Sequence, residues 1–325
     1  MEGTLRLGSI DQASWVATIG NFDGFHLGHQ HVFDKLRIAA RLYRSKIAVF
    51  SFSPHPITVL KPEIDKRFIY SENDKIRLFS DWGADIIFMI DFNKELSQMT
   101  AEQFFTEKLL PFHPLKKLVV GADFCFGNHR QGSVARLGEF CNHAGLELEV
   151  VPLLQSDNRV ISSSVIRQLL QKGDFLSVSK MLGRMWSVRG KVVKGNMLGR
   201  KIGFPTANLS LSHAPPLAYG SYACLVKHRG QSWLAAANYG IKPTFKDNKP
   251  TFEVHLLNFE FDIYNQELQV FVLHKLRDEK KFTSLSDLKE AIRADINHVR
   301  NKFKVWQQKF SPYLLEKDYA NSCES

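Results

Sequence analysis

The sequence predicts an α/β domain with a parallel sheet, followed by a compact all-β domain and a long helix. In the first half, short apolar runs recur at wide spacing with helical patterns between them, which is typical of βαβ units. After about residue 186, β-type segments follow one another without intervening helices. A chain of 325 residues also exceeds the size at which one hydrophobic core usually keeps growing, so we expect two domains.

The strands of the first half are predicted by continuous apolar runs, which suit a sheet covered on both faces. These runs are KIAVFSF (46–52), ADIIFMIDF (84–92), KLVVGADF (117–124) and LELEVVPLL (146–154). A three-and-four spacing of apolar residues predicts a helix after the first glycine-rich turn. Its apolar face comprises Val32, Phe33, Leu36, Ala40 and Tyr43.

The second half predicts an antiparallel sheet or barrel, because turn residues such as KHRGQS (227–232) and FKDNKP (245–250) separate its β-type segments. The segments are WSVRGKVV (186–193), YACLVKH (222–228), QSWLAAANYG (231–240), TFEVHLLNF (251–259) and LQVFVLHKL (268–276). From Ser284 to about Trp306 an apolar stripe predicts a helix packed on the barrel. The stripe comprises Leu285, Leu288, Ile292, Ile296, Val299, Phe303 and Trp306.

A short helical pattern at 172–186 leads into the first segment of the second half. We therefore expect domains at 1–185 and 186–310, with a C-terminal tail at 311–325. The sequence contains no internal repeat that would favour a solenoid.

Charge and hydropathy argue against some classes of protein. The formal net charge is +10, but the basic residues are dispersed without a run of about five like charges, so we expect no nucleic-acid partner. The first residues lack a signal sequence, and about 18 uncharged apolar residues never occur together, so we expect no membrane association and a cytoplasmic location. No CxxC pair occurs among Cys125, Cys141, Cys224 and Cys323, which favours free or buried thiols. The sequence does not indicate an oligomeric state.

The segment TIGNFDGFHLGHQHVF (18–33) places an apolar strand before a glycine-rich turn, two histidines in HxGH spacing, and a helix. Glycines permit close approach of the backbone to phosphates, and a helix N-terminus presents unpaired N–H groups. His26 and His29 could donate hydrogen bonds to phosphate oxygens as charge builds on leaving pyrophosphate. On the residues alone, a strand-to-helix turn with two incidental histidines remains open.

A second polar cluster opens another helical pattern, ISSSVIRQLL (161–170). Arg167 could hold a phosphate with two donors, and the serines at 162–164 could bind an oxyanion. The serines could equally well only cap the helix.

These segments resemble the FMN adenylyltransferase module of bacterial bifunctional FAD synthetases. The resemblance rests on IGNFDGFHLGHQ (19–30), FSPHP (52–56), GADFCFGNHRQGS (121–133) and ISSSVIR (161–167), in that order. It implies a Rossmann-like nucleotidyltransferase fold with the catalytic residues His26 and His29. It also implies an ATP and phosphate site of Gly20, Phe22, Gly24, Gly28, Ser162, Ser163, Ser164 and Arg167, and a flavin site of Asp123, Asn128 and Arg130.

Two positions depart from the pattern of that family. Ser164 stands where a threonine is common, which keeps the hydroxyl group. Ser53 stands where an acidic residue is frequent, so a role for a carboxylate there is in doubt.

The second half has no GxxxxGK[ST] motif, so phosphoryl transfer cannot rest on a Walker A loop. Instead, RGKVVKGNMLGRKIGFPTANL (189–209) offers closely spaced glycines that would let backbone amides surround phosphates. In an extended segment Thr206 and Asn208 share one face, and two neutral oxygen ligands suit Mg²⁺. A simple turn entering a strand would give the same spacing.

Alternation in FEVHLLNF puts Glu253, His255 and Leu257 on one face, where Glu253 could accept a hydroxyl proton. A solvent-facing glutamate in an edge strand is the alternative.

The same run resembles the signature of riboflavin kinases. The resemblance continues through YGSYAC (219–224), ANYGIKPTF (237–245), FEVHLLNFEFDIYNQELQV (252–270) and LRDEKKF (276–282), with Ser221 where valine is usual. It implies a six-stranded Greek-key barrel followed by a helix, magnesium held by Thr206 and Asn208, and Glu253 as catalytic base. It further implies ATP-phosphate contacts from Gly195, Gly199, Arg200 and Lys201, and a flavin contact from Arg277.

Together the resemblances imply an enzyme of two activities. Riboflavin and ATP would give FMN and ADP, and FMN and a second ATP would give FAD and pyrophosphate, with Mg²⁺ as cofactor. Two alternatives remain at this point: a kinase whose first domain uses another adenylyl acceptor, and a flavin-sensing or RNA-binding regulator that uses the basic surface.

Overall fold

The computed structural model describes residues 4–7, 14–64, 67–111, 114–156, 159–195, 197–241 and 250–313, with the backbone alone for 4–7. Contacts divide the chain into two compact units. The first comprises Met1–Lys66 and Tyr70–Ser163, and the second Arg67–Ile69 and Ser164–Ser325. The domain boundary predicted between residues 185 and 186 stays a prediction, and most of the predicted tail lies outside the described residues.

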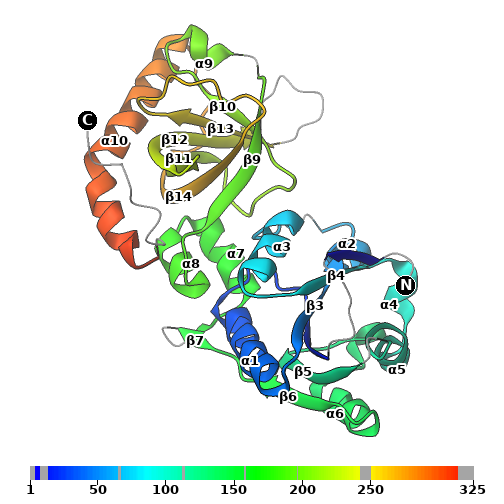
Figure 1. The fold of residues 1–325 in the computed structure, drawn as a ribbon. Coiled ribbons are helices and arrows are strands. Elements are labelled where there is room, and N and C mark those ends of the chain that lie inside the picture. The colour runs from blue at the N-terminus through cyan, green and yellow to red at the C-terminus, as the bar shows by residue number, and fades with distance from the viewer. Residues whose placement is uncertain are drawn as a thin grey trace. The chain divides into compact units, whose positions relative to one another are not determined.

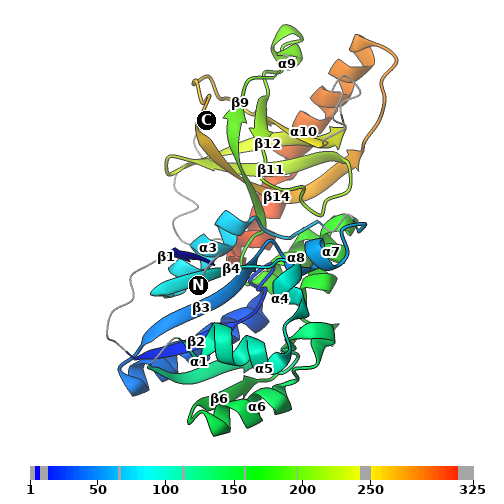
Figure 2. The ribbon, with the colours of Figure 1, turned by 90° about the vertical axis from the view of Figure 1, so that its right-hand side faces the viewer.

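The first unit is built on a six-stranded sheet in the order β1-β4-β3-β2-β5-β6 (Figure 2). Only β1 runs antiparallel to its neighbour; the other strands are parallel. The four apolar runs of the first half form β3, β4, β5 and β6, as predicted. The strands are β1 (Thr4–Leu7), β2 (Trp15–Ile19), β3 (Lys46–Ser53), β4 (Ile86–Asp91), β5 (Leu115–Gly121) and β6 (Glu147–Val151).

Hydrophobic cores fill both faces of this sheet. On one face Phe33 and Phe79, from α1 and α3, pack with the strands, and on the other Phe104 and Leu137, from α5 and α6, do so. The helical pattern predicted after the glycine-rich turn is α1. The helices of this part of the chain are α1 (Leu27–Tyr43), α2 (Pro56–Leu60), α3 (Glu72–Asp81), α4 (Lys94–Gln98), α5 (Ala101–Phe104), a π-helical turn (Phe105–Leu109), a 3₁₀ turn (Asn128–Arg130) and α6 (Val134–His143).

The strand order reverses between β2 and β5. The chain runs from β2 through β3 to β4, and then returns to the other side of β2 for β5 and β6. In open α/β sheets, ligands bind outside the carboxyl ends of the strands at such a switch point. The HxGH segment follows β2 and the segment of residues 121–133 follows β5, so the topology brings both to this crevice.

The second unit contains a closed six-stranded antiparallel barrel in the order β10-β13-β12-β11-β14-β9 (Figure 1). Three consecutive strands, β11 to β13, pair in sequence, and β14 returns to lie beside β11, which is a Greek key. The barrel and its topology agree with the prediction. The strands are β9 (Ser187–Val193), β10 (Ala207–Ser210), β11 (Gly220–His228), β12 (Gln231–Ile241), β13 (Pro250–Leu256) and β14 (Glu267–Asp278).

Turn chemistry fixes the hairpin between β11 and β12. Arg229 and Gly230 both have positive φ, 48° and 79°, as a two-residue type I′ turn requires. This confirms the turn predicted at 227–232. The turn predicted at 245–250 falls almost entirely outside the described residues.

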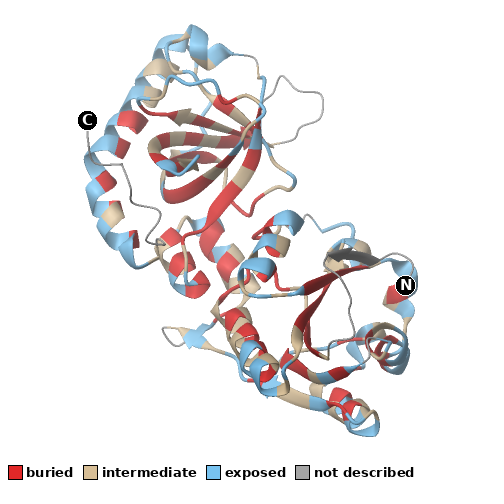
Figure 3. Cartoon of the chain, viewed as in Figure 1, coloured by how far each residue is buried: buried red, intermediate tan, exposed pale blue. Residues whose placement is uncertain are grey.

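Buried residues recur along the barrel strands of the second unit (Figure 3), and aromatic side chains are among the largest of them. Phe175 on α8 packs against Trp186 and Tyr222, with ring centroids 6.3 Å and 5.9 Å away. Each such buried side chain contributes on the order of 2 kcal/mol to folding. The remaining elements are the hairpin β7 (Gln155–Ser156) and β8 (Arg159–Val160), the helices α7 (Ser163–Lys172), α8 (Phe175–Leu182), α9 (Leu198–Lys201) and α10 (Leu285–Phe310), and a 3₁₀ turn (Ser311–Tyr313).

Helix α10 packs along the barrel against β11, β12 and β14. Ser284 caps its N-terminus by accepting a hydrogen bond from the Asp287 N–H, as its position before the stripe predicts. The stripe is buried only from Ile296 onward, whereas Leu285 is 58% exposed. The prediction that the first turn of α10 belongs to the packed face was therefore wrong. Periodicity shows which side of a helix is apolar, but not how far along the helix the barrel covers it.

Among the described helices, none is long and apolar enough to cross a membrane. Cys125, Cys141 and Cys224 are free thiols, as expected, and Cys323 lies outside the described residues.

Candidate active sites

The loop between β2 and α1 is held in an unusual conformation by two buried rings. Phe22 and Phe25 both have left-handed backbone, with φ of 49° and 41°, and their rings are 5% and 0% exposed. The Phe22 ring packs edge-on against Phe33 and Phe79. A Cβ at Gly20 would lie 2.9 Å from that ring. Since the side chain of Phe22 belongs to the core, only its backbone could meet a ligand in the predicted phosphate site.

His26 and His29 stack on each other where α1 begins. Their ring centroids are 3.6 Å apart with an interplanar angle of 18°. His26 is the N-cap residue of α1, and Gly28 leaves room for its ring, since a Cβ there would lie 3.2 Å from it. The two histidines thus lie at the positive end of the helix dipole, where an anion is stabilised.

A hydrogen bond joins two of the sequence motifs in the first unit. Ser163 Oγ donates to the carbonyl oxygen of Asp23 at 2.7 Å. Ser162 and Ser163 are half-buried, and Ser164 and Arg167 follow on α7. Ser163 therefore anchors the loop that precedes the histidines.

A buried cation lies beneath the same loop. Lys75 on α3 is 6% exposed, and its Nζ donates to the carbonyl oxygen of Asn21 at 3.3 Å. Burial lowers the pKa of Lys75, while the charges of Asp23 and Glu72 act in the opposite direction. Neither Lys75 nor Asp23 was a predicted site residue. The sequence could have indicated that Lys75 is buried, because Lys75 lies four residues before the buried Phe79, on the apolar face of α3.

The segment after β5 forms a closed loop that presents Asn128 and Arg130. A bridge between Phe126 and Gly132 closes the loop, and the Asn128 N–H donates to the Met99 carbonyl at 2.7 Å. Asn128 is half-buried and Arg130 exposed. Asp123 is also exposed, just after the end of β5. All three predicted flavin contacts thus follow the strand beside the switch point.

A carboxylate is present beside Ser53 although the residue itself is not acidic. Ser53 Oγ donates to a carboxylate oxygen of Glu72, the first residue of α3. The substitution noted at position 53 therefore leaves an acidic group nearby, supplied by a different strand-to-helix segment. Sequence spacing alone could not pair residues 19 positions apart.

In the second unit, the antiparallel register brings Asn208 opposite Glu253. The pair joins β10 to β13, and Asn238 lies opposite Glu253 on the other side, in β12. The flanking residues Phe252 and Val254 are fully buried, whereas Glu253 is half-buried. The polar side chains therefore share the face opposite the barrel core.

Two glycines pack closely against the predicted metal ligands. A Cβ at Gly195 would lie 2.4 Å from Asn208 Nδ2, and one at Gly199 would lie 3.1 Å from Thr206 Oγ1. Any larger residue at these positions would displace the amide or the hydroxyl group. The loop before β10 thus forms a cradle around two oxygen-bearing side chains, which suits a hard cation such as Mg²⁺. No cluster of three His, Cys, Asp or Glu side chains able to hold a metal ion occurs among the described residues.

The other predicted residues of this unit lie on α9 and β14. Arg200 and Lys201 are exposed at the end of α9. Arg277 donates from Nε and Nη2 to Asp295 of α10, at 3.1 Å and 2.9 Å for the oxygen Oδ2. Asp295 is 8% exposed and was not predicted, although an acid between the apolar residues of a stripe usually has a buried partner.

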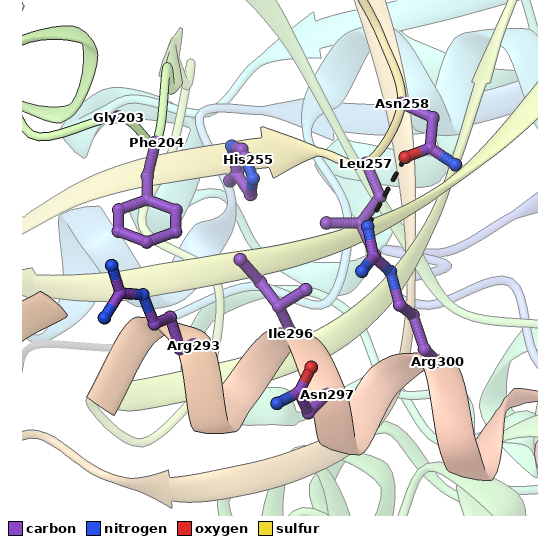
Figure 4. A pocket seen from close by; sticks show the side chains of 9 residues that line it. All are labelled: Gly203, Phe204, His255, Leu257, Asn258, Arg293, Ile296, Asn297 and Arg300. Atoms are coloured by element: carbon purple, nitrogen blue, oxygen red, sulfur yellow. Dashed lines mark hydrogen bonds between the residues drawn. The ribbon is translucent and has the colours of Figure 1, made fainter. Parts of the chain in front are cut away.

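A pocket of 410 Å³ opens between β13 and α10 (Figure 4). Phe204 and His255 line one side, and Arg293, Ile296 and Arg300 of α10 the other. The His255 ring meets Phe204 edge-on, and its Nδ1 lies 2.7 Å from the Pro205 carbonyl. Since a carbonyl only accepts, Nδ1 carries the proton. Gly203, Leu257, Asn258 and Asn297 complete the lining.

Comparison with known proteins finds a matching family for each half of the chain. The FAD synthetase family model matches residues 9–165, and the riboflavin kinase model matches residues 182–303. A bifunctional riboflavin kinase/FMN adenylyltransferase of Buchnera aphidicola (Schizaphis graminum) is 34% identical, covering 94% of this chain and 99% of its own. The protein of the same name from Escherichia coli K12 is 32% identical, covering 91% and 95%. The chain belongs to this family.

As a member of the bifunctional riboflavin kinase/FMN adenylyltransferase family, the chain phosphorylates riboflavin to FMN and adenylylates FMN to FAD. A solved structure described as a macrolide-efflux protein from Streptococcus pneumoniae is also similar, with a TM-score of 0.77 and 31% identity over 90% of this chain and 95% of that one. The fold is therefore shared along nearly the whole length.

Proposed function

We propose that adenylyl transfer takes place at the HxGH loop and riboflavin phosphorylation at the Asn208 and Glu253 pair. The observation that carries the proposal is the register of β10 with β13, which pairs a predicted metal ligand with the predicted base. ATP is the nucleotide substrate of both reactions. The proposal places the enzyme in the cytoplasm, acting on riboflavin, FMN and ATP without a nucleic-acid or membrane partner.

In adenylyl transfer, a phosphate oxygen of FMN attacks the α-phosphorus of ATP, and the bond to pyrophosphate breaks. Negative charge grows on the leaving pyrophosphate. His26, His29 and the N–H groups opening α1 would stabilise that charge, with Gly20, Gly24 and Gly28 allowing close approach of the backbone. Ser162, Ser163, Ser164 and Arg167 would hold further phosphate oxygens, and Asp123, Asn128 and Arg130 would orient FMN.

In the kinase reaction, the ribityl 5′-hydroxyl of riboflavin attacks the γ-phosphorus of ATP. Glu253 would accept the hydroxyl proton as the new P–O bond forms. Gly195 packs against Asn208 and Gly199 against Thr206, and both would let backbone N–H groups approach the triphosphate. Arg200 and Lys201, at the end of α9, would offset its charge. Arg277, already oriented by Asp295, would contact the flavin.

Mg²⁺ fits the donor set between the two glycines. Thr206 and Asn208 supply a hydroxyl and an amide oxygen, the neutral ligands that leave room for water and nucleotide oxygens. When bound, the ion would draw charge from the triphosphate. The chain's own contribution is to hold the two oxygens in place, which the close approach of Gly195 and Gly199 supports.

The pocket at α10 suits the base and ribose of the kinase's ATP. Its volume falls in the usual range for small-molecule sites. Phe204 lies two residues before Thr206, and His255 lies two residues after Glu253 on the same face of β13, so the pocket adjoins the proposed chemistry. The Phe204 ring offers a surface for stacking a base.

A timed chromatographic assay with riboflavin, ATP and Mg²⁺ tests the assignment of sites. Wild-type protein should accumulate FMN before FAD. His29→Ala should stop at FMN, whereas Glu253→Ala should form FAD only when FMN is supplied. If His29→Ala still makes FAD at the wild-type rate, adenylyl transfer takes place elsewhere, and if Glu253→Ala keeps the kinase rate, another group is the base.

A further inference from the structure

Lys75 is a buried basic residue that the proposed chemistry does not use. It lies on α3, whose start is fixed by Ser71: the Ser71 hydroxyl accepts from the Asp74 N–H at 3.1 Å and donates to the Asp74 carboxylate at 2.6 Å. A buried ammonium group is costly unless it is paired and hydrogen-bonded. A specific role for the hydrogen bond that Lys75 donates to the Asn21 carbonyl would account for this cost.

Asn21 belongs to the loop of residues 21–25, in which three successive backbone carbonyl groups accept hydrogen bonds from other groups of the protein. Asn21 accepts from Lys75 at 3.3 Å, Phe22 from the Phe25 N–H at 3.1 Å, and Asp23 from Ser163 at 2.7 Å. Carbonyl oxygens that are engaged in this way do not face an approaching anion. A loop whose carbonyls are held can present its N–H groups to phosphate oxygens.

The loop cannot keep this shape without support. Two non-glycine residues, Phe22 and Phe25, hold left-handed conformations, each of which costs about 1 kcal/mol or more. Asp23 adds a further difficulty, because it is 2% exposed and lies three residues before His26. Its negative charge would repel a triphosphate, and the charge of Lys75 opposes it.

We propose that Lys75 is a positioning residue for adenylyl transfer: it holds the Asn21 carbonyl and offsets the charge of Asp23, so that the loop before His26 accepts the triphosphate of ATP. Lys75 touches neither substrate in this role. The proposal rests on the proposed function of the first unit, and it assigns to α3 a part in binding ATP.

The test is Lys75→Met in the full chain, assayed by pyrophosphate release from FMN and ATP without riboflavin, so that the kinase is silent. We expect kcat/KM for ATP to fall on the order of 100-fold through a higher KM, with KM for FMN unchanged. The riboflavin kinase activity of the same molecules should be unaffected. Adding Asp23→Asn to Lys75→Met should recover part of the KM for ATP, because the uncompensated negative charge is removed.

The matched control is Lys35→Met, which removes a partly exposed lysine of α1 that pairs with Glu149 at 3.6 Å. It should leave both KM values unchanged. Wild-type parameters in Lys75→Met would overturn the proposal, as would a lower kcat with both KM values unchanged, which is the mark of a merely structural role. If Lys75→Met reduces the folded fraction, Lys75→Arg, which keeps the positive charge, is assayed beside it. Equal KM values for ATP in the two variants would also overturn the proposal.

His29→Ala in the same assay separates this proposal from the one on which it rests. Retained FAD synthesis in His29→Ala would mean that the HxGH site is not where adenylyl transfer occurs. Loss of FAD synthesis in His29→Ala together with a wild-type KM for ATP in Lys75→Met would leave the site in place and remove only the role of Lys75.

Discussion

Asn208 and Glu253 face each other directly across the antiparallel pair of β10 and β13. Directly opposed residues in such a pair have Cβ atoms about 5 Å apart and side chains on the same face. The proposed ligand of magnesium and the proposed base are therefore held by the hydrogen-bond register of a closed barrel. A site on a barrel wall is more rigid than one built from loops alone.

We expect substitutions of Asn208 and Glu253 to have strongly non-additive effects on the kcat of riboflavin phosphorylation. Asn208→Ala should lower kcat about ten-fold, and Glu253→Gln about 100-fold or more, because a general base contributes at least that much. The double variant should be no slower than Glu253→Gln, since residues that act together lose their contribution once. Steady-state kinetics with riboflavin measures all three. Additive losses would mean that the two side chains act independently.

Gly199 is predicted to tolerate no side chain. A Cβ there would lie 2.3 Å from the Phe204 carbonyl oxygen, so Gly199→Ala must shift the backbone before Thr206. Strain of this kind costs about 1–3 kcal/mol, and we expect kinase kcat/KM to fall about ten-fold or more. FAD synthesis from supplied FMN should not change.

The control for Gly199→Ala is Gly138→Ala on α6. There a Cβ would make only an ordinary contact, 3.7 Å from Leu148, and the helix should become about 0.5 kcal/mol more stable. Neither activity should change. Full kinase activity in Gly199→Ala would show that this loop can adjust without harm.

The Arg277 and Asp295 pair predicts a change in both stability and riboflavin binding. Asp295→Asn keeps the shape of the side chain but removes the charge that accepts two hydrogen bonds from Arg277. We expect a loss of about 2 kcal/mol from the second unit and a higher KM for riboflavin. Thermal unfolding and kinase kinetics are the measurements. A lower Tm with an unchanged KM would limit the pair to a structural role.

We expect the protonation of His274 to make the free energy of unfolding depend on pH. Partial burial lowers its pKa below the usual 6.5, with further lowering from the charges of His298 and Lys309. Between the lowered pKa and 6.5 the unfolded chain binds more protons, so stability falls as the pH drops through this window. Tm should therefore fall more between about pH 7.5 and about pH 5.5 in the wild type than in His274→Gln. Parallel curves would contradict this.

The elements of both units follow from local patterns in the sequence. Apolar runs such as KIAVFSF predict buried parallel strands because both faces of the sheet are covered, and β3 forms there. The extended segment expected at Thr206 and Asn208 likewise forms, with Asn208 in β10 and Thr206 directly before it. These inferences succeed because a strand's period depends only on its neighbours in the chain.

Contacts between distant segments could not be predicted in this way. Lys75 meets Asn21 across 54 positions, and Asp295 meets Arg277 only because α10 packs against the barrel. The pairing of Asn208 with Glu253 likewise depends on how the barrel closes, which no local pattern specifies. Buried charges on otherwise apolar helix faces are the signal that sequence reasoning should have used, since each needs a partner.

Residues 67–69 lie far upstream in the chain yet belong to the second unit. The carbonyl of Ile69 accepts the indole N–H of Trp186 at 3.0 Å, and Arg67 donates to the Leu217 carbonyl at 3.1 Å. Gene fission between the two halves would thus produce a kinase fragment with an unsatisfied, buried indole, at a cost of about 1–3 kcal/mol. The three-residue segment is an evolutionary obstacle to separating the two activities onto independent chains.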